Sequence, residues 1–302
     1  MKKIIAMTLA LVLALGVLVG CGSEPAETTT PAETNGTESA QNNAETTAPA
    51  QTNGVLRVAT SPDFAPMEFV DPTKSGQDQF VGFDITLAKF IASELNMELE
   101  IMPMDFNASQ MAVYAGTVDM AISGFSWTED RAANYNISDY YHAGDNEDEQ
   151  ILITLAENAD KYATIESLKG AKIGAQNASL QQSLVEEQLT DSELVLFTDL
   201  GTAVLQLQNG DFDCIAVADG NGEAIIANNP SIIKSGFNFV VDEKYTGNVI
   251  LLQKGNDELT AKVNEILAKA AQYYDEWYEE AKSIAGIQVT YDEEGNAIGE
   301  VE

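Results

Sequence analysis

Short apolar runs alternate with amphipathic segments along most of the chain after residue 54. The apolar runs predict β-strands at 55–59, 97–102, 118–123, 171–175, 194–197, 213–217 and 248–252. The amphipathic segments predict helices at 84–95, 107–115, 179–189, 200–209, 221–228 and 257–284. Asp84 is placed to cap the first of these helices. Strands that alternate with helices are typical of a parallel sheet with covering helices, so the pattern predicts an α/β fold.

Two distant passages repeat one pattern. AVYAGTVDMAISG (112–124) and QLQNGDFDCIAVADG (206–220) each end a predicted helix, place a glycine and then an aspartate, and run into an apolar strand. The glycines, Gly116 and Gly210, suit a left-handed helix terminus. Polar residues follow each strand at its carboxyl end, where open α/β sheets bind ligands. We therefore expect two α/β lobes of similar construction that meet at a cleft.

The segment 257–284 carries a regular apolar stripe, so we expect it to pack back on the first lobe. Lobe 1 then comprises 54–140 and 242–285, and lobe 2 comprises 141–241. The chain would cross twice between the lobes and so form a hinge. The acidic tail 286–302 lacks a sustained apolar pattern and stays unassigned.

The first residues have the character of an export signal. Residues 1–20 begin with two lysines and continue as an uncharged apolar run. The following Leu-Val-Gly-Cys resembles the lipobox of bacterial lipoproteins, in which the cysteine, here Cys21, receives the lipid. An ordinary signal peptide or an uncleaved anchor is the alternative.

Residues 22–53 contain no Val, Ile, Leu, Met, aromatic or basic residue. Such a composition cannot bury enough apolar surface to offset the entropy of ordering, so 21–53 is expected to be a lipid-anchored tether. With Cys21 lipidated, only Cys214 remains, which leaves no intrachain disulfide. Cys214 stands in the apolar run CIAVA, where a small buried strand residue is expected.

The charge of the chain limits its partners. Its 48 acidic and 15 basic side chains give a formal net charge of −33, which repels phosphate backbones. Nucleic acid is therefore not expected as a partner. At 45% apolar residues the chain can still bury a genuine core.

The chain contains two arginines, Arg57 and Arg131. Arg57 lies inside a strand and is expected at an edge or in solvent. Arg131 follows SGFSWTED, and its planar guanidinium group can hold a carboxylate by two parallel hydrogen bonds. Helix amides and the hydroxyls of Ser123, Ser126 and Thr128 would complete an anion cradle. The alternative makes Thr128 a plain N-cap and Arg131 a surface partner for Glu129 or Asp130.

From about residue 54 to 285 the chain resembles the extracytoplasmic solute-binding proteins of family 3, which deliver polar amino acids to ABC importers. LRVATSPDFAPMEF, VGFDITLAKFIASELN, GTVDMAISGFSWTEDR, ISDYY, LKGAKIGAQNAS and DFDCIAVADG stand in the order and at the spacing of that family. The resemblance implies a type II periplasmic-binding-protein-like fold that closes over one amino acid. It further implies an ABC permease as partner, a monomeric protein without cofactor, and a lipid-anchored location on the extracytoplasmic face of the cell membrane.

The resemblance also implies roles for individual residues. Arg131 would clamp the α-carboxylate of the ligand with help from Ser126, Asp219 would accept the α-ammonium group, and Phe64 and Phe106 would cover the ligand. Asp219 could instead lie in a solvated turn, and the two phenylalanines could be core residues. Trp127 could line the cleft or pack outside it.

Two positions depart from the family pattern. Many relatives have two hydroxyl residues where this chain has Ser179 and Leu180, so one side-chain hydrogen bond to the ligand would be missing. Relatives that bind basic amino acids often carry an acid near the position of Ser61. Its absence favours a neutral or sulfur-containing ligand, although Asp63 lies close enough to weaken that inference.

Two other functions compete with transport. Some members of this fold are dehydratases, for which His142, Glu68 or Asp105 could supply a general base. The same domain can also present its closed form to a receptor as a sensor. One histidine and one free cysteine do not make a metal site, and the acidic run DNEDE in 144–150 lacks the ligand spacing of a calcium loop.

Overall fold

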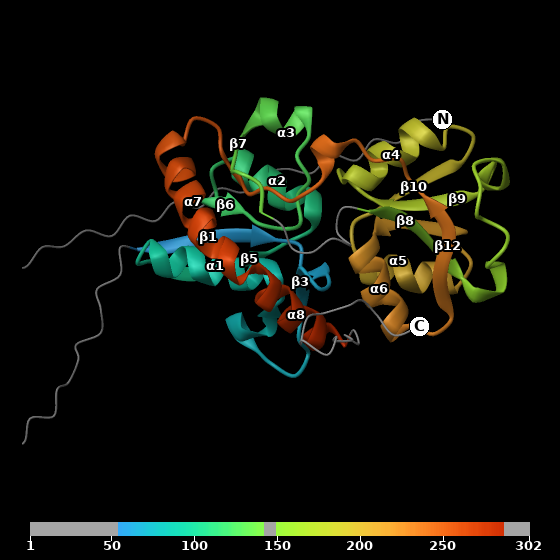
Figure 1. The fold of residues 1–302 in the computed structure, drawn as a ribbon, viewed down its shortest axis with the longest axis horizontal. Coiled ribbons are helices and arrows are strands. Elements are labelled where there is room, and N and C mark those ends of the chain that lie inside the picture. Colours follow the sequence, from blue (N-terminus) through green and yellow to red (C-terminus); the bar gives the residue numbers. More distant parts are fainter. Residues whose placement is uncertain (1–53, 142–148, 287–302) are drawn as a thin grey trace, which may run out of the picture. The chain divides into compact units, whose positions relative to one another are not determined.

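The computed structural model describes residues 54–141 and 149–286 and contains two five-stranded sheets. The first has the order β5-β1-β6-β13-β7, and the second has the order β10-β9-β11-β8-β12 (Figure 1). The strands of the first sheet are β1 (Val55–Thr60), β5 (Glu98–Pro103), β6 (Met120–Ala121), β7 (Tyr135–Ile137) and β13 (Leu251–Gln253). Those of the second are β8 (Gln150–Leu155), β9 (Lys172–Gln176), β10 (Glu193–Phe197), β11 (Cys214–Ala218) and β12 (Ile232–Asn238).

The two sheets have the same construction. In each, the first three strands in the order are parallel, the fourth pairs antiparallel with the third, and the fifth pairs antiparallel with the fourth. A small third sheet of β2 (Asp63–Phe64), β3 (Glu68–Val70) and β4 (Phe80–Val81) extends the first lobe. The protein is therefore an α/β protein of two similar lobes, as the repeated pattern predicts.

The repeated glycine and aspartate have equivalent roles in the two lobes. Gly116 and Gly210 follow helices with φ of 69° and 81°, which is the left-handed conformation that glycine adopts without strain. The aspartates three residues later, Asp119 and Asp213, accept hydrogen bonds from the backbone N–H of Arg57 and Lys172, at 2.8 and 2.9 Å. Each aspartate therefore links the segment after its helix to the neighbouring parallel strand.

Helices cover both faces of each sheet. In the first lobe these are α1 (Phe83–Glu94), α2 (Phe106–Tyr114), α3 (Glu129–Asn134), α7 (Asp257–Ala270) and α8 (Tyr274–Ala285). In the second they are α4 (Leu180–Gln188), α5 (Leu200–Gln208) and α6 (Asp219–Asn228). Alternate residues of β11 enter different cores, with Cys214 and Ala216 in one and Ile215 and Val217 in the other. This strand is buried on both faces, so the prediction for Cys214 is confirmed.

The chain passes between the sheets after β7 and returns before β13. Tyr141 on the first crossing and Asn248 on the second exchange two backbone hydrogen bonds, each of 2.9 Å. The two crossings are thus joined to each other, as expected for a two-stranded hinge.

Several predicted elements differ from the structure. The segment predicted as one helix over 257–284 is divided into α7 and α8 by a 3₁₀ turn at Ala271–Tyr273. The break lets Tyr274, Trp277 and Tyr278 all pack around the ring of Phe83. Asp84 is not the cap of α1, because the cap is Gly82 and the Asp84 carboxylate instead bonds to Gly124 and Tyr141. The prediction omitted β8 and β12, whose sequences lack a regular polar alternation.

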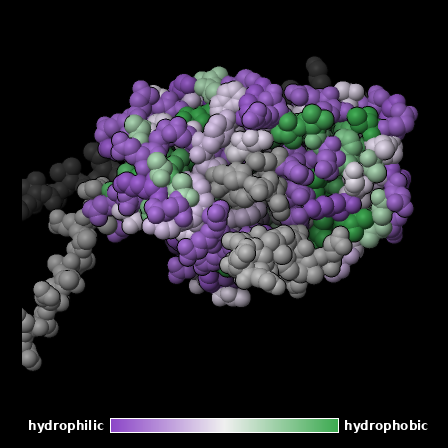
Figure 2. Space-filling view, viewed as in Figure 1, coloured by the Kyte–Doolittle hydropathy of each residue, from purple (hydrophilic) through white to green (hydrophobic). Residues whose placement is uncertain are grey.

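Hydrophilic side chains make up much of the face drawn in Figure 2, and hydrophobic side chains surface in separate areas, among them one over the second lobe.

Arg57 is exposed and pairs with Glu100 at 3.1 Å, as predicted for an edge or solvent position. Within the described ranges, none of the helices combines the length and apolarity that crossing a membrane requires.

Candidate functional site

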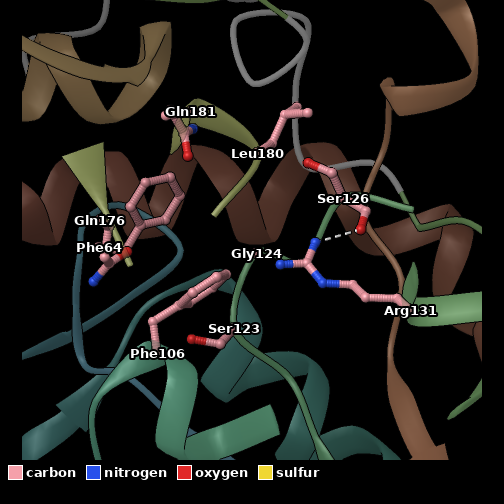
Figure 3. Close-up of a pocket in the computed structure, with 9 residues that line it drawn as sticks. All are labelled: Phe64, Phe106, Ser123, Gly124, Ser126, Arg131, Gln176, Leu180 and Gln181. Carbon is pink, nitrogen blue, oxygen red and sulfur yellow. Dashed lines mark hydrogen bonds between the residues drawn. The ribbon is translucent and has the colours of Figure 1, made fainter. Parts of the chain in front are cut away.

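A pocket with an empty volume of about 300 Å³, part of it open to solvent, lies where the ends of the two sheets meet. The first lobe contributes the segment after β6 together with residues of β2, α2 and α3, and the second contributes the end of β9 and the start of α4. The lining residues are Phe64, Phe106, Ser123, Gly124, Ser126, Arg131, Gln176, Leu180 and Gln181 (Figure 3).

Arg131 is held rigidly at one side of this pocket. It lies in the first turn of α3, where the Thr128 hydroxyl caps its backbone N–H at 3.2 Å, and it is 5% exposed. Its Nε donates to Gln110 Oε1 at 3.1 Å, and its Nη1 donates to the carbonyl oxygen of Ser126 at 2.6 Å. Its Nη2 donates to the carbonyl oxygen of Ala178 in the second lobe at 2.9 Å. Figure 3 shows the guanidinium group extending toward Gly124 and the pocket.

The guanidinium group is a buried charge without a buried counter-charge. Burial lowers the pKa of Arg131 to about 10, so the group stays charged at neutral pH. Among residues 54–141 and 149–286, no carboxylate forms an ion pair with it. The rings of Phe106 and Phe125 lie 5.5 and 5.1 Å from Cζ and offset part of the desolvation. The three hydrogen bonds leave a second N–H on both Nη1 and Nη2.

The N-terminus of α4 supplies further donors. Ser179 is its N-cap, and the Ser179 hydroxyl accepts from the backbone N–H of Gln182 at 3.1 Å. The backbone N–H groups of Leu180 and Gln181 come before the first intrahelical hydrogen bond, and both residues line the pocket. Amides at a helix start favour an anion. Arg131 and the start of α4 therefore present donors to one space from opposite lobes.

Ala178 makes this arrangement possible at a conformational cost. Its φ is 63°, a left-handed value that residues other than glycine seldom adopt. In this conformation its carbonyl oxygen accepts from Arg131 Nη2, and its N–H donates to Gln182 Oε1 at 2.8 Å. The loop before α4 is thus anchored by both lobes.

Two buried carboxyl groups, those of Glu68 and Asp84, form hydrogen bonds with residues that line the pocket. The Ser123 hydroxyl donates to Glu68 at 2.5 Å, and Asp84 accepts from the Gly124 N–H at 2.7 Å and from the Tyr141 hydroxyl at 3.0 Å. Burial and the neighbouring Asp84 raise the pKa of Glu68 well above its usual range, and burial raises that of Asp84 to about 6. The pair therefore holds a proton at neutral pH, which avoids two adjacent buried negative charges.

Five of the ten residues predicted to bind the ligand line the pocket and five do not. Those in the lining are Phe64, Phe106, Ser123, Ser126 and Arg131. Those outside it are Ser61, Trp127, Thr128, Ser179 and Asp219. Phe64 contacts the cores of both lobes, and Phe106 is a buried core residue that also faces the pocket. Both rings are therefore core residues and pocket-lining residues at the same time.

The predicted hydroxyl cradle around Arg131 is only partly present. Thr128 is the plain N-cap of α3, and Ser179 is the N-cap of α4, so both hydroxyls accept from helix amides. Ser123 accepts from the N–H of Ser61 at 3.0 Å while it donates to Glu68. Ser61 itself donates to Asp63 at 2.8 Å. Ser126 also lines the pocket, and its hydroxyl caps no helix and has no side-chain hydrogen bond to another described residue.

Asp219 lies at the start of α6, 8% exposed, but its carboxylate is bound inside the protein. Lys234 on β12 places Nζ 2.9 Å from Asp219 Oδ1 and 2.7 Å from Glu223 Oε1. Burial raises the pKa of Asp219, and Lys234 opposes that shift. Asp219 is therefore neither a solvated turn residue nor part of the pocket lining in this structure.

Several alternatives from the sequence can now be decided. Arg131 is not a surface partner of Glu129, because Glu129 pairs with Lys244 at 2.7 Å. Trp127 packs beside the core that contains Phe125, outside the pocket lining. The thiol of Cys214 is buried, which raises its pKa to about 12 and disfavours the reactive thiolate. Cys21 and His142 lie outside the described residues.

Four residues that contribute to the site were missed by the sequence interpretation. Gln110 orients Arg131, Gln176 and Gln181 line the pocket, and Ala178 accepts from Arg131 across the lobes. Gln110 follows Phe106 by one helical turn, and this spacing is the signal that could have indicated it. Within the described residues, no group of three or more His, Cys, Asp or Glu is arranged to hold a metal ion.

Comparisons with known proteins agree with this architecture. The sequence model of bacterial extracellular solute-binding proteins, family 3, matches residues 56–281. The histidine-binding periplasmic protein of Escherichia coli is 27% identical over 223 residues, which are 71% of this chain and 81% of that protein.

Solved structures resemble the chain over a similar range. The substrate-binding protein AbpA of an amino acid ABC transporter from Streptococcus pneumoniae, bound to L-arginine, is 30% identical with a TM-score of 0.71. The match covers 78% of this chain and 97% of AbpA. An ancestral arginine-binding protein bound to glutamine is 29% identical with a TM-score of 0.66, and the match covers 78% of this chain and all of that one, 100%.

Proposed function

Because the chain belongs to the bacterial extracellular solute-binding proteins of family 3, we propose that it binds a polar amino acid between its lobes for an ABC importer. The observation that carries this proposal is Arg131, a charged guanidinium group that is 5% exposed and has no carboxylate partner among the described residues. Desolvating such a charge is costly unless an anion joins it. A ligand α-carboxylate would be that anion.

The carboxylate would lie between Arg131 and the start of α4. The remaining N–H groups on Nη1 and Nη2 can hold its two oxygens, and the amides of Leu180 and Gln181 can approach from the second lobe. A ligand held this way contacts both lobes at once, so its binding free energy favours the closed form. Phe64 and Phe106 would cover its apolar atoms.

The ligand's ammonium group is assigned to Asp219 by resemblance to the family. In the structure Lys234 occupies that carboxylate, so we propose that the ligand ammonium displaces or joins Lys234 Nζ there. Substitution of Asp219 by Asn would then weaken binding of a free amino acid. The same substitution would have little effect on binding of a ligand that lacks the ammonium group.

A neutral polar or sulfur-containing side chain suits the lining best. Apart from Arg131, the described lining residues are uncharged, and Gln176 and Gln181 can both donate and accept hydrogen bonds. A basic side chain is the second candidate, favoured by the names of relatives that bind histidine or arginine. Asp63 is the closest acid in sequence to the lining residue Phe64, but its oxygens already accept from Ser61 and Leu200.

A thermal-shift screen of the purified protein against the twenty amino acids, cystine and several other organic anions tests the proposal. A ligand that binds only the folded state raises the melting temperature. A rise with glutamine, methionine or cystine that exceeds the rise with arginine and histidine supports the neutral ligand, and the reverse order supports the basic one. Recovery of the ligand unchanged after incubation distinguishes binding from the dehydratase alternative. If no amino acid raises the melting temperature, the proposal is wrong.

We further propose that residues 1–20 direct export and that Cys21 carries the lipid. The tether 21–53 would then hold the binding domain near a permease on the outer face of the membrane. Substitution of Cys21 by Ser should move the protein from the membrane fraction to the soluble fraction. Retention of the variant in the membrane would argue against lipid anchoring.

A further inference from the structure

The side-chain amide of Gln176 is oriented by groups that accept hydrogen bonds. Its Nε2 donates to Asp63 Oδ2 at 3.3 Å and to the carbonyl oxygen of Thr198 at 3.5 Å. The same Asp63 oxygen accepts from the backbone N–H of Leu200 at 2.8 Å. A carbonyl oxygen cannot donate, so the nitrogen of the amide, and not its oxygen, must face Thr198.

The oxygen of this amide is left for the pocket. Gln176 lines the pocket and is only 9% exposed (Figure 3). Among the described residues none donates a hydrogen bond to Gln176 Oε1, and this atom is not fully buried. Both N–H groups of Nε2 have partners inside the protein. A ligand in the pocket therefore meets Gln176 as a hydrogen-bond acceptor.

Asp63 strengthens this acceptor. Its carboxylate lies on the nitrogen side of the Gln176 amide, and a hydrogen bond to a carboxylate polarises the amide that donates it. Polarisation places more negative charge on Oε1. A ligand group that donates is favoured beside this oxygen, and a ligand group that can only accept is disfavoured.

Gln181 offers a similar pattern from the start of α4. Its Nε2 donates to Gln150 Oε1 at 2.6 Å, which leaves one N–H on Nε2. Within the described ranges no residue donates to Gln181 Oε1, and Gln181 lines the same pocket. The two glutamines together present two acceptors and one donor.

A primary carboxamide is the neutral group that complements this set. It carries two N–H donors and one carbonyl acceptor. A thioether or a disulfide has no N–H or O–H to donate, and an ionised carboxylate only accepts. Each of these would leave the oxygen of Gln176 without a partner when the pocket closes, which costs free energy.

We infer that Gln176 is a specificity-determining residue that selects a ligand side chain able to donate a hydrogen bond, with a primary carboxamide as the neutral group that fits best. The inference rests on the proposed function, because it concerns the side chain of the same amino acid whose carboxylate is assigned to Arg131. It narrows the neutral candidates to those that donate, and so removes methionine and cystine.

Isothermal titration of the full chain with matched amino acids tests this inference. The first set is glutamine, glutamate and methionine, the second is asparagine, aspartate and leucine, and the third is lysine and norleucine. The side chains within a set have similar length, and only the first member of each donates a hydrogen bond at neutral pH. In the sets that bind, we expect the donor to bind roughly tenfold or more tightly than the others.

Gln176→Met assigns the preference to this residue. Methionine has nearly the same length as glutamine and lacks the amide oxygen, so the variant should bind the members of a set with Kd values within roughly threefold of each other. The control is Gln208→Met, because Gln208 is exposed on α5 and bonds to Asn229 outside the pocket. The control should keep the full preference for the donor.

The outcomes separate this inference from the proposed function. If methionine or glutamate binds as tightly as glutamine, the inference is overturned, whereas the proposed function stands because an amino acid binds. A donor preference that survives Gln176→Met also overturns the inference. If no amino acid binds, the proposed function itself fails. Should Gln176→Met not fold, the comparison of matched ligands on the unmodified protein still decides.

Discussion

Arg131 Nη2 donates a hydrogen bond of 2.9 Å to the carbonyl oxygen of Ala178, and this bond joins the two lobes at the ligand pocket. The same guanidinium group is the charge to which we assign the ligand carboxylate. One side chain would therefore take part both in ligand binding and in the contact between the lobes. The bond therefore aligns the parts of the site that the two lobes contribute before the ligand binds.

Asp63 is a second link between the lobes, and its loss should weaken ligand binding. Its Oδ2 accepts from the Leu200 N–H at 2.8 Å and from Gln176 Nε2 at 3.3 Å, both in the second lobe. Because these bonds join the two lobes, Asp63→Ala should disfavour closure over the ligand and raise the apparent Kd by roughly tenfold. Isothermal titration measures the change.

Asp199→Ala is the matched control for Asp63. Asp199 caps α5 through the Thr202 N–H at 2.7 Å, within one lobe. The control should lower the free energy of unfolding by about 1 kcal/mol and leave the Kd nearly unchanged. An unaltered Kd in Asp63→Ala would show that the bond does not contribute to closure.

The buried pair Glu68 and Asp84 should make stability fall as pH rises. Both pKa values are raised, so the folded protein holds protons that the unfolded chain, with its ordinary carboxyl pKa near 4, releases. The stabilising contribution is full below pH 4 and is lost as the pH rises through the folded pKa, which for Asp84 is about 6. Glu68→Gln mimics the protonated acid and should gain stability relative to the unmodified protein from pH 5 to 8.

Chemical denaturation at several pH values measures this difference. Glu98→Gln, at an exposed position on β5, controls for the loss of one negative charge. A difference between Glu68→Gln and the unmodified protein that stays constant from pH 5 to 8 would contradict a shared proton.

Lys234 should be needed to hold Asp219 and Glu223 together. Lys234→Met leaves two poorly exposed carboxylates without their common cation, and we expect a loss of about 1–2 kcal/mol in unfolding free energy, discounted because the Lys234 side chain is 43% exposed. Lys262→Met breaks the exposed pair with Glu258, which is 2.8 Å long, and should cost less unfolding free energy than Lys234→Met.

Addition of Glu223→Gln should recover part of the loss in Lys234→Met, because it removes one of the two repelling charges. Urea unfolding of the single and double variants is the measurement. If Lys234→Met costs no more than Lys262→Met, the cluster around Lys234 does not contribute to stability.

The sequence predicted the parts of the fold that depend on local pattern. The repeated glycine and aspartate appear in both lobes as expected, with Asp119 and Asp213 in equivalent bonds. The sequence did not predict β8 or β12, whose pairing depends on residues distant in the chain.

The same limit explains the candidate site. Arg131 was predicted because it stands in a distinctive local motif, and Phe64 and Phe106 were predicted from the resemblance to the family. Glutamine is common along the chain, so the sequence does not single out Gln176 and Gln181. These two reach the pocket because they lie at the end of β9 and the start of α4. The pairing of Asp219 with Lys234 was missed for a related reason, because the position of Lys234 beside α6 depends on the pairing of β12 with the distant strand β8.

The central claim is that Arg131 holds the carboxylate of an amino acid ligand. Isothermal titration of the best ligand from the thermal-shift screen into Arg131→Met and into the unmodified protein tests it most directly. We predict binding roughly a hundredfold or more weaker in the variant, because two charge-assisted hydrogen bonds are lost. The unliganded variant should remain folded, since methionine fills much of the same space without a buried charge. An unchanged Kd in a folded Arg131→Met protein would contradict the claim.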